Sequence, residues 1–355
     1  MYEPDMRKKL EKRGLVLSTS GKRMAWPDWV KGIGILSIVM AHVTQYFPGG
    51  AYYLNKILCS YHVPIFFVWG GVSAALWPKQ YQGTRRDFYL RRVRRFLIPY
   101  VLFSLFNSAL KLGVLLLTHK LTKPALMEEL SALLITGNGT VWFLVTLFLI
   151  EIIFYETKNR ELLRLVTATA GLVLSFLLQN HITPLLLLLV RAGFGFSYFM
   201  IGYLFWKWYS NHEKNIPLYK SLAVGLLLLP AGCVMACLCR FRLEFFSGAF
   251  HNGFAAVPIS LLFSIGIILV AYSLRDRSNG ILRLVQYFGR ESLLVMLIHP
   301  TVLLFFTYPF GSRFVSLTGV RSFVCAMITF AAVTALNVPP ICIINRWFPI
   351  LNGRR

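Results

Sequence analysis

The stretch DWVKGIGILSIVMAHVTQYFP, residues 28–48, contains an apolar helix about long enough to cross a bilayer. It carries a lysine, Lys31, near its start and a histidine, His42, deep inside it. Eleven positions separate the two residues, which places them roughly 16 Å apart along a helix axis. An ionisable side chain inside a spanning helix costs about 2.5–3.5 kcal/mol on insertion scales, so such residues usually mark a pathway or a reacting group.

The composition indicates an integral membrane protein. Of the 355 residues, 56% are hydrophobic and only 14% are charged, whereas a soluble domain is about 25% charged. The 37 basic and 14 acidic residues give a net charge of +23, which could suggest binding to nucleic acid. The basic residues, however, lie in short clusters between long apolar runs, as in the loops of a multispanning protein. We therefore expect a lipid bilayer as partner and no nucleic acid.

Ten apolar runs are each near the ~20 residues that a bilayer demands. Their expected bounds are 30–47, 57–77, 96–118, 131–155, 162–179, 185–206, 221–239, 254–274, 291–308 and 322–344. Alternate connections, counted from the N-terminal tail, hold 27 Lys and Arg residues, and the other connections hold 7. The positive-inside rule therefore predicts an all-α bundle of about ten transmembrane helices with both termini cytoplasmic.

This topology predicts three parts of the chain: a basic cytoplasmic tail over 1–29, a membrane domain over 30–346 and a short cytoplasmic tail over 347–355. No small-residue cleavage site follows the first apolar run, so we expect a retained helix. The basic connection from Pro78 to Arg95 is expected to form an interfacial helix. The expected location is the cell (inner or plasma) membrane, crossed many times.

Several polar residues fall at membrane depth in this topology. His62 is expected near the outer boundary, Arg191 roughly 10 Å below the outer face, and His299 near the middle of its helix. Each has a structural alternative, because an intramembrane histidine often only bonds a neighbouring helix. Arg191 is harder to explain by packing, since it follows the run LLLLLV.

Acidic residues are scarce near His42. Asp28 lies on the same helix but at the opposite face of the membrane, and Glu128, Glu129 and Glu244 belong to outer loops that could fold back. The group that orients His42 is therefore not identified by the sequence. The six cysteines form no paired CxxC spacing, so we expect no metal site.

The segment FYLRRVRRFLIPY concentrates four arginines at the cytoplasmic start of the third predicted helix: Arg91, Arg92, Arg94 and Arg95. Arginine suits bidentate recognition of phosphate, which a nucleotide-bearing donor would present there. The alternative is that these residues set the topology and contact anionic lipid.

Five segments in order resemble one known family: DWVKGIGILSIVMAH, HVPIFFVWGG, RRVRRFLIPY, GTVWFL and LLVMLIHP. They resemble the integral-membrane acyltransferase 3 family, and most closely its branch of fucose 4-O-acetylase-like proteins. The family hallmark is a basic residue and a histidine with ten residues between them, which Lys31 and His42 match. Lys31 stands where the wider family often has arginine, and Gly70-Gly71 replaces the usual Ser-Gly.

The resemblance implies transfer of an acetyl or similar short acyl group from cytoplasmic acyl-CoA to a hydroxyl of an extracytoplasmic sugar or glycan. It implies acetyl-CoA as donor substrate and no permanently bound cofactor. His42 would act as general base or as covalent acyl carrier. The further assignments are Arg191 beside the reacting carbonyl, Lys31 with Arg91, Arg92, Arg94 and Arg95 on the donor's phosphates, and His62, Trp142 and His299 on the acceptor.

Two other interpretations compete with an O-acetyltransferase that modifies polysaccharide. One is a multispanning transporter or glycan flippase, although the chain shows neither the inverted repeats nor the broken helices that transporters often have. The other is a structural or signalling membrane protein whose buried cations only fix the packing. Protection by CoA against thermal unfolding would separate both from the enzyme.

Overall fold

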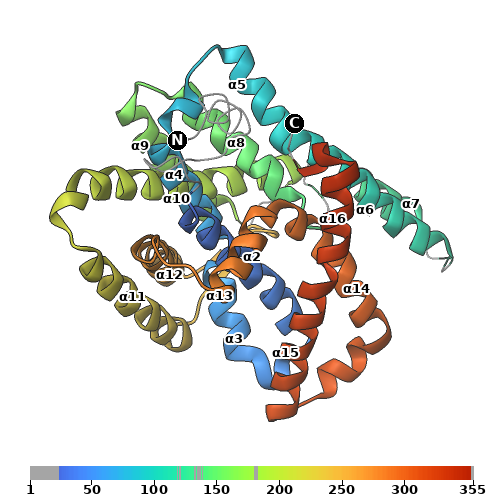
Figure 1. Ribbon diagram of the computed structural model, residues 1–355. Helices are drawn as coiled ribbons and strands as arrows, with labels where there is room; N and C mark the ends of the chain where they lie inside the picture. The colour runs from blue at the N-terminus through green and yellow to red at the C-terminus, as the bar shows by residue number, and fades with distance from the viewer. Residues whose placement is uncertain are drawn as a thin grey trace.

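The computed structural model describes residues 24–352, apart from residues 118, 120, 132, 134–136, 138 and 180–182. Most of the predicted N-terminal tail (residues 1–23) and residues 353–355 lie outside the described part. The first half of the described chain is built from helices and helical turns (Figure 1): α2 Trp26–Thr44, α3 Pro48–Tyr61, α4 Pro64–Leu76, η1 Pro78–Tyr81, α5 Arg85–Arg92, η2 Val93–Leu97, α6 Ile98–Leu117, α7 Lys123–Ser131, α8 Trp142–Glu156 and α9 Glu161–Leu178.

The second half continues in the same way and adds a short antiparallel hairpin, in which Leu243 lies opposite Phe250. Its elements are α10 Pro184–His212, η4 Glu213–Asn215, α11 Leu218–Leu238, β1 Arg242–Glu244, β2 Ala249–His251, α12 Gly253–Ser273, α13 Gly280–Arg290, α14 Ser292–Ser316, α15 Gly319–Leu336, α16 Val338–Trp347 and η5 Pro349–Asn352. The sequence did not predict the hairpin, because three-residue strands carry no readable alternation.

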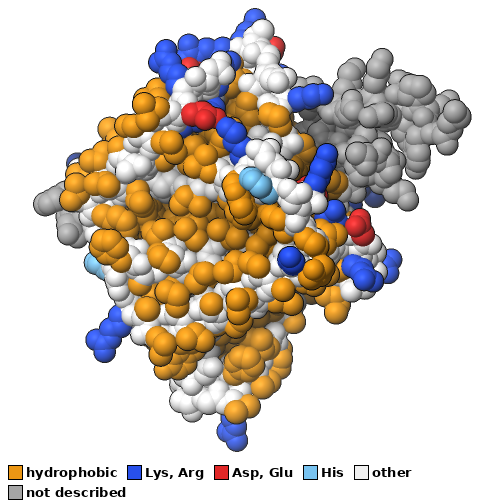
Figure 2. All heavy atoms as spheres, turned by 90° about the vertical axis from the view of Figure 1, so that its left-hand side faces the viewer, with side chains coloured by type: hydrophobic (Ala, Val, Ile, Leu, Met, Phe, Trp, Pro, Cys, Tyr) orange, Lys and Arg blue, Asp and Glu red, His pale blue; other side chains and the backbone are white. Residues whose placement is uncertain are grey.

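Eight segments of the described chain are long and apolar enough to cross a membrane: Pro48–Leu76, Arg85–Leu117, Glu161–Leu178, Pro184–Asn215, Leu218–Leu238, Gly253–Ser273, Ser292–Ser316 and Gly319–Trp347. Two predicted spans, α2 and α8, fall outside this set. Helix α2 carries Asp28, Lys31 and His42, and α8 has only 15 residues. Hydrophobic side chains cover the middle of the face in Figure 2, and most charged side chains lie toward its margins. The predicted all-α membrane bundle is confirmed.

Proline and glycine account for three wrong helix boundaries. The first helix begins at Trp26 and not at 30, with Pro27 in its first turn, where a missing N–H is tolerated. The second span begins at Pro48 and not at 57, and it is interrupted before Pro64. The fourth begins at Trp142 and not at 131. Gly137 and Gly139 precede it with positive φ angles of 75° and 54°, a conformation that a helix cannot contain.

Helices α4 and α10 cross at a pair of glycines. A Cβ added to Gly71 would lie 1.8 Å from the carbonyl oxygen of Phe199, and one added to Gly202 would lie 2.0 Å from that of Val68. The two backbones therefore touch, as small residues allow within membranes. This contact fixes α4, which runs from the site described below toward the predicted cytoplasmic side.

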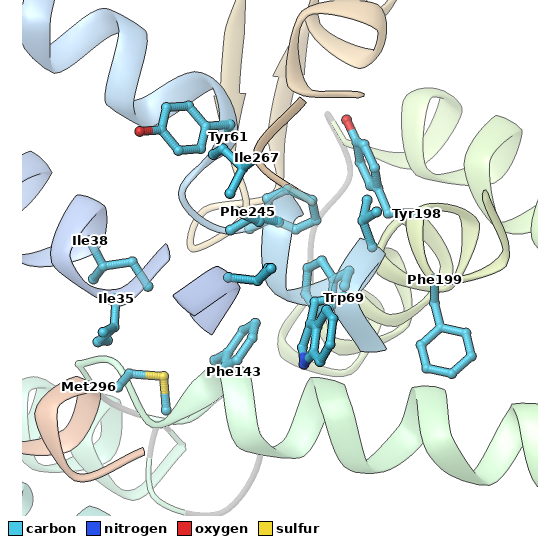
Figure 3. Packing of buried hydrophobic residues seen from close by; sticks show 14 of the residues in the cluster. Ile35, Ile38, Tyr61, Trp69, Phe143, Tyr198, Phe199, Phe245, Ile267 and Met296 are labelled. Atoms are coloured by element: carbon cyan, nitrogen blue, oxygen red, sulfur yellow. The ribbon is translucent and has the colours of Figure 1, made fainter. Parts of the chain in front are cut away.

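Helix α2 is held in a similar way against α13. A Cβ added to Gly289 would lie 1.7 Å from the carbonyl oxygen of Asp28. Farther along α2, buried side chains enter the common core, where Ile38 of α2, Phe143 of α8 and Met296 of α14 pack around one interior region (Figure 3). Helices α8 and α14, which are distant in the sequence, thus pack against the second half of α2, which carries His42.

Candidate active site

Two histidines far apart in the sequence meet inside the bundle. His42 on α2 and His299 on α14 lie with His42 Nδ1 2.9 Å from His299 Nε2, and their ring centroids are 5.0 Å apart. His299 is fully buried, whereas His42 is partly exposed. His299 is therefore the partner that orients His42, which the sequence left unidentified. The sequence placed His299 at membrane depth but assigned it to the acceptor.

A backbone carbonyl determines which nitrogen of each neutral ring carries the hydrogen. His299 Nδ1 lies 2.8 Å from the carbonyl oxygen of Val295, one helical turn earlier. A carbonyl only accepts, so His299 Nδ1 must donate, and its Nε2 then accepts. His42 Nδ1 is the donor to that Nε2, which leaves the lone pair of His42 on Nε2. The arrangement keeps His42 in the form that can accept a proton.

His42 lines a cavity of about 580 Å³. Its wall mixes aromatic rings with a few polar groups, as ligand sites usually do. The polar lining residues are His42, His62, Gln45, Asn55, Lys56, Thr140 and Glu244. The aromatic ones are Trp142, Phe143, Phe241, Phe245 and Phe246. Such rings suit the apolar faces of a sugar, and the polar groups suit its hydroxyls.

His62 and Trp142 both line this cavity, and their predicted binding of the acceptor stays a prediction. His62 lies at the break between α3 and α4, where its Nδ1 donates to the carbonyl oxygen of Leu58 over 2.9 Å. Its Nε2 therefore holds the lone pair when the ring is neutral. Trp142 is the first residue of α8, and its ring stacks 6.4 Å from that of Phe245.

Arg191 lies behind the cavity wall and is not among the residues that line it. It is 1% exposed, and its Nε donates to the carbonyl oxygen of Phe245 over 3.0 Å. Its Nη2 donates to the carbonyl oxygen of Phe246, and the guanidinium lies 4.8 Å from the Trp142 ring. The structure thus gives Arg191 the position of a group that holds the hairpin turn. The sequence placed it beside the reacting carbonyl.

Asn55 is a site residue that the sequence did not single out. Its Nδ2 donates to the carbonyl oxygen of Ala41 over 2.8 Å and to Thr44 Oγ1 over 2.9 Å. These contacts hold the end of α2 on both sides of His42. Thr140 was missed as well, and its Oγ1 donates to the carbonyl oxygen of Met296 over 2.7 Å, which joins the turn before α8 to α14. No local pattern distinguishes such polar residues from ordinary loop residues.

The predicted donor-binding cations lie in different surroundings. Lys31 pairs with Asp28 on its own helix at 2.8 Å. Arg94 and Arg95 are exposed. Arg91 donates to the carbonyl oxygen of Gln82 over 3.2 Å and so supports the turn after α4. These four residues remain predicted ligands of the donor.

Arg92 is buried in a network at the same end of the bundle. Its Nη2 lies 2.9 Å from Glu151 Oε2, and Tyr81 donates a hydrogen bond to the same carboxylate over 2.6 Å. Burial, with the neighbouring Glu151 carboxylate, raises the pKa of Tyr81 well above its usual value. Tyr81 therefore remains a hydrogen donor. The Arg92 guanidinium is engaged within the fold, and it faces the ring of Tyr81 at 5.2 Å.

Comparison with known proteins gives one family match. No curated protein and no solved structure matches the chain. A family model described as an acyltransferase domain matches residues 24–336, which include the described membrane spans up to α15, both histidines and the cavity that His42 lines. The chain therefore belongs to the acyltransferase 3 family of membrane acyltransferases.

Proposed function

We propose that the protein moves an acetyl or similar short acyl group from cytoplasmic acyl-CoA to a hydroxyl of an extracytoplasmic sugar or glycan. The observation that carries this proposal is the contact of His42, which lines the 580 Å³ cavity, with His299 behind it. A histidine with its basic nitrogen fixed by a second ring is suited to take a proton from an acceptor hydroxyl. The resemblance to fucose 4-O-acetylase-like proteins makes fucose-containing glycans the first acceptors to test.

In the proposed reaction, His42 Nε2 removes the proton of the acceptor hydroxyl while its oxygen attacks the thioester carbonyl. The new C–O bond forms, the C–S bond breaks, and the proton on His42 passes to the departing thiolate. His42 Nδ1 donates to His299 Nε2 throughout, which supports the transient imidazolium. In the covalent alternative, His42 Nε2 itself attacks the thioester, and the C–S bond breaks to release the CoA thiolate. The acceptor oxygen then forms the new C–O bond as the C–N bond breaks, and the hydroxyl proton passes to the thiolate.

The remaining site residues are proposed to bind the two substrates or to support the cavity beside His42 and His299. His62 and Trp142 are proposed to hold the acceptor, since both line the cavity. Arg191 is proposed to act indirectly, by holding the turn at Phe245 against the same cavity. Lys31, with the arginines of 91–95, is proposed to serve the donor's phosphates from the cytoplasmic side.

The test is transfer of labelled acetyl from acetyl-CoA to a panel of sugars by the purified full-length protein in neutral detergent. We expect His42→Ala to lower turnover by about 10²- to 10⁴-fold, the contribution of a positioned general base. His212→Gln is a matched control, because His212 is exposed and bonds only within its own helix to the carbonyl oxygen of Trp208 in the described contacts. Full activity of His42→Ala would refute the assignment.

The same preparation separates the enzyme from a transporter or flippase. A donor that binds the folded protein raises its unfolding temperature by mass action. We expect CoA to stabilise the wild-type protein, and a transporter of glycans gives no reason for such protection. Absence of both CoA protection and labelled transfer would reject the proposed donor.

A further inference from the structure

A second cavity, of about 740 Å³, lies at the opposite end of α4 from His42. It is lined in part by residues within 78–83, after α4, within 158–164, which run into α9, and within 207–211, the last turns of α10. All three segments lie at or beside connections that the distribution of Lys and Arg assigns to the cytoplasm. The cavity therefore opens on the side from which an acyl donor would come.

Basic side chains outnumber acidic ones in the lining of this cavity. Lys158, Arg164 and Lys207 line it, and Glu161 is the carboxylate among the lining residues. Glu161 pairs with Lys207, and both side chains are well exposed. The lining thus has an excess of two positive charges over its carboxylate, which favours an anionic ligand with more than one charge.

Arg164 distinguishes this cavity from a solvated basic surface. It is only 7% exposed, and its Nη2 donates to the carbonyl oxygen of Phe154 over 3.0 Å. Its Nε is buried and has no hydrogen-bond partner among the described residues. A buried donor without a partner is destabilising, and a phosphate oxygen would provide the missing acceptor.

Three aromatic rings complete the wall: Phe154, Tyr81 and Tyr203. Rings of this kind stack on the flat base of a nucleotide. Arg92 lies over the Tyr81 ring at 5.2 Å, and Arg91 supports the turn at Gln82. Two of the four arginines that the sequence assigned to the donor's phosphates thus shape the wall of this cavity.

Helix α4 connects the two cavities. Val63, at its N-cap, lines the cavity of His42, and Ala74, near its C-terminus, lines the second cavity. Eleven residues of helix place them roughly 16 Å apart along the axis. A donor held by its phosphates at the second cavity would need an extended arm to bring its thioester to His42, and CoA has such an arm.

We propose that this second cavity is the phosphate-binding site for the nucleotide end of the acyl donor, with Lys158, Arg164 and Lys207 as its cationic groups. The inference rests on the proposed function, since it assumes an acyl-CoA donor. Glu161 pairs with Lys207 and would compete with the phosphate for that lysine.

The experiment measures CoA affinity by calorimetry with the purified full-length protein in neutral detergent. We expect Lys158→Gln and Arg164→Gln each to weaken CoA binding about tenfold, as for loss of one charge-assisted hydrogen bond. Glu161→Gln should bind CoA several-fold more tightly, because it removes the competing carboxylate. Lys214→Gln is the matched control, since Lys214 is an exposed residue of η4 that does not line the cavity.

Opposite signs for Lys158→Gln and Glu161→Gln would support the site, and a misfolded protein cannot produce them. Since Arg164 is buried, Arg164→Lys, which keeps the charge, should recover part of the affinity. Unchanged CoA affinity in Lys158→Gln, Arg164→Gln and Glu161→Gln, with wild-type binding intact, would overturn the site and leave the acyltransferase proposal standing. If the substitutions abolish binding to phosphatidylglycerol vesicles but leave CoA binding unchanged, the ligand is a lipid headgroup and the inference fails.

Discussion

His42 Nδ1 and His299 Nε2 lie 2.9 Å apart, although 257 positions separate the two residues in the chain. The carbonyl oxygen of Val295 fixes the hydrogen on the other nitrogen of His299, and so the basic nitrogen of His42 is its Nε2. This relationship resembles the role of a carboxylate behind a catalytic histidine, with a neutral ring in its place.

Replacement of His299 tests this relationship. We expect His299→Ala to lower kcat by about 10- to 100-fold, the usual loss when the group that orients a functional histidine is removed. The KM for the acceptor should change little, because His299 acts through His42. His299→Gln should recover part of kcat if its side-chain oxygen accepts the hydrogen from His42. A large rise in KM with unchanged kcat would instead make His299 an acceptor ligand, as the sequence suggested.

Arg191 offers a test of positioning against direct catalysis. We expect Arg191→Met to raise amide hydrogen exchange in the hairpin, residues 242–251, because the turn loses its contacts to Phe245 and Phe246. The KM for the acceptor should rise with it, since both phenylalanines line the cavity. Wild-type exchange in the hairpin combined with a large fall in kcat would show that Arg191 acts on the reacting carbonyl.

The Arg92–Glu151 pair is expected to be essential for stability. Both side chains are at least 90% buried, so Arg92→Ala would leave an uncompensated carboxylate and destabilise the protein by about 3–5 kcal/mol. Thermal unfolding in detergent measures the change. Arg85→Ala is the control on the same helix: its pair with Glu156 is largely exposed to solvent, and its loss should destabilise the protein far less than Arg92→Ala does. Equal effects of the two substitutions would contradict this account.

The close crossing of α4 and α10 predicts that one added methyl group at this contact lowers the stability of the protein. Gly202→Ala would place a Cβ 2.0 Å from the carbonyl oxygen of Val68, so the helices must separate. We expect a destabilisation of about 1–3 kcal/mol, as for overpacked cores. Gly113→Ala is the matched control, because this α6 glycine has nothing within 4 Å of an added Cβ. It should be neutral or stabilise by up to about 1 kcal/mol. A neutral Gly202→Ala would show that the backbones are not in contact.

Much of the architecture could be predicted from composition and charge. Long apolar runs must form helices in a bilayer, because no water is present there to satisfy the backbone. Five segments in order, among them the one that carries Lys31 and His42, resembled the acyltransferase 3 family, and the match over residues 24–336 confirms that family. The predicted helix boundaries were wrong where proline or glycine interrupts a helix inside an apolar run, as at Pro64 and at Gly137 and Gly139.

The composition of the site could be predicted only in part. His42 and His62 were identified as residues at membrane depth and Trp142 as a candidate for acceptor binding, and all three line one cavity. Asn55, Thr140 and the hairpin turn at Phe245 were missed, because their roles depend on neighbours that are distant in the chain. Lys158 and Arg164 looked like ordinary loop cations, and only the packing of the chain after α4 and before α9 against the end of α10 makes them the wall of a cavity.

The sequence by itself determined that this protein is a helical membrane bundle with a basic residue and a histidine on its first helix. These properties depend on local sequence, because each apolar run becomes a helix in the bilayer by virtue of its own length and hydrophobicity. Only the tertiary structure decided that His299 orients His42 and that Arg191 holds a turn. A hydrogen bond depends on distances of about 3 Å between atoms of different helices, and residue type alone does not encode such distances.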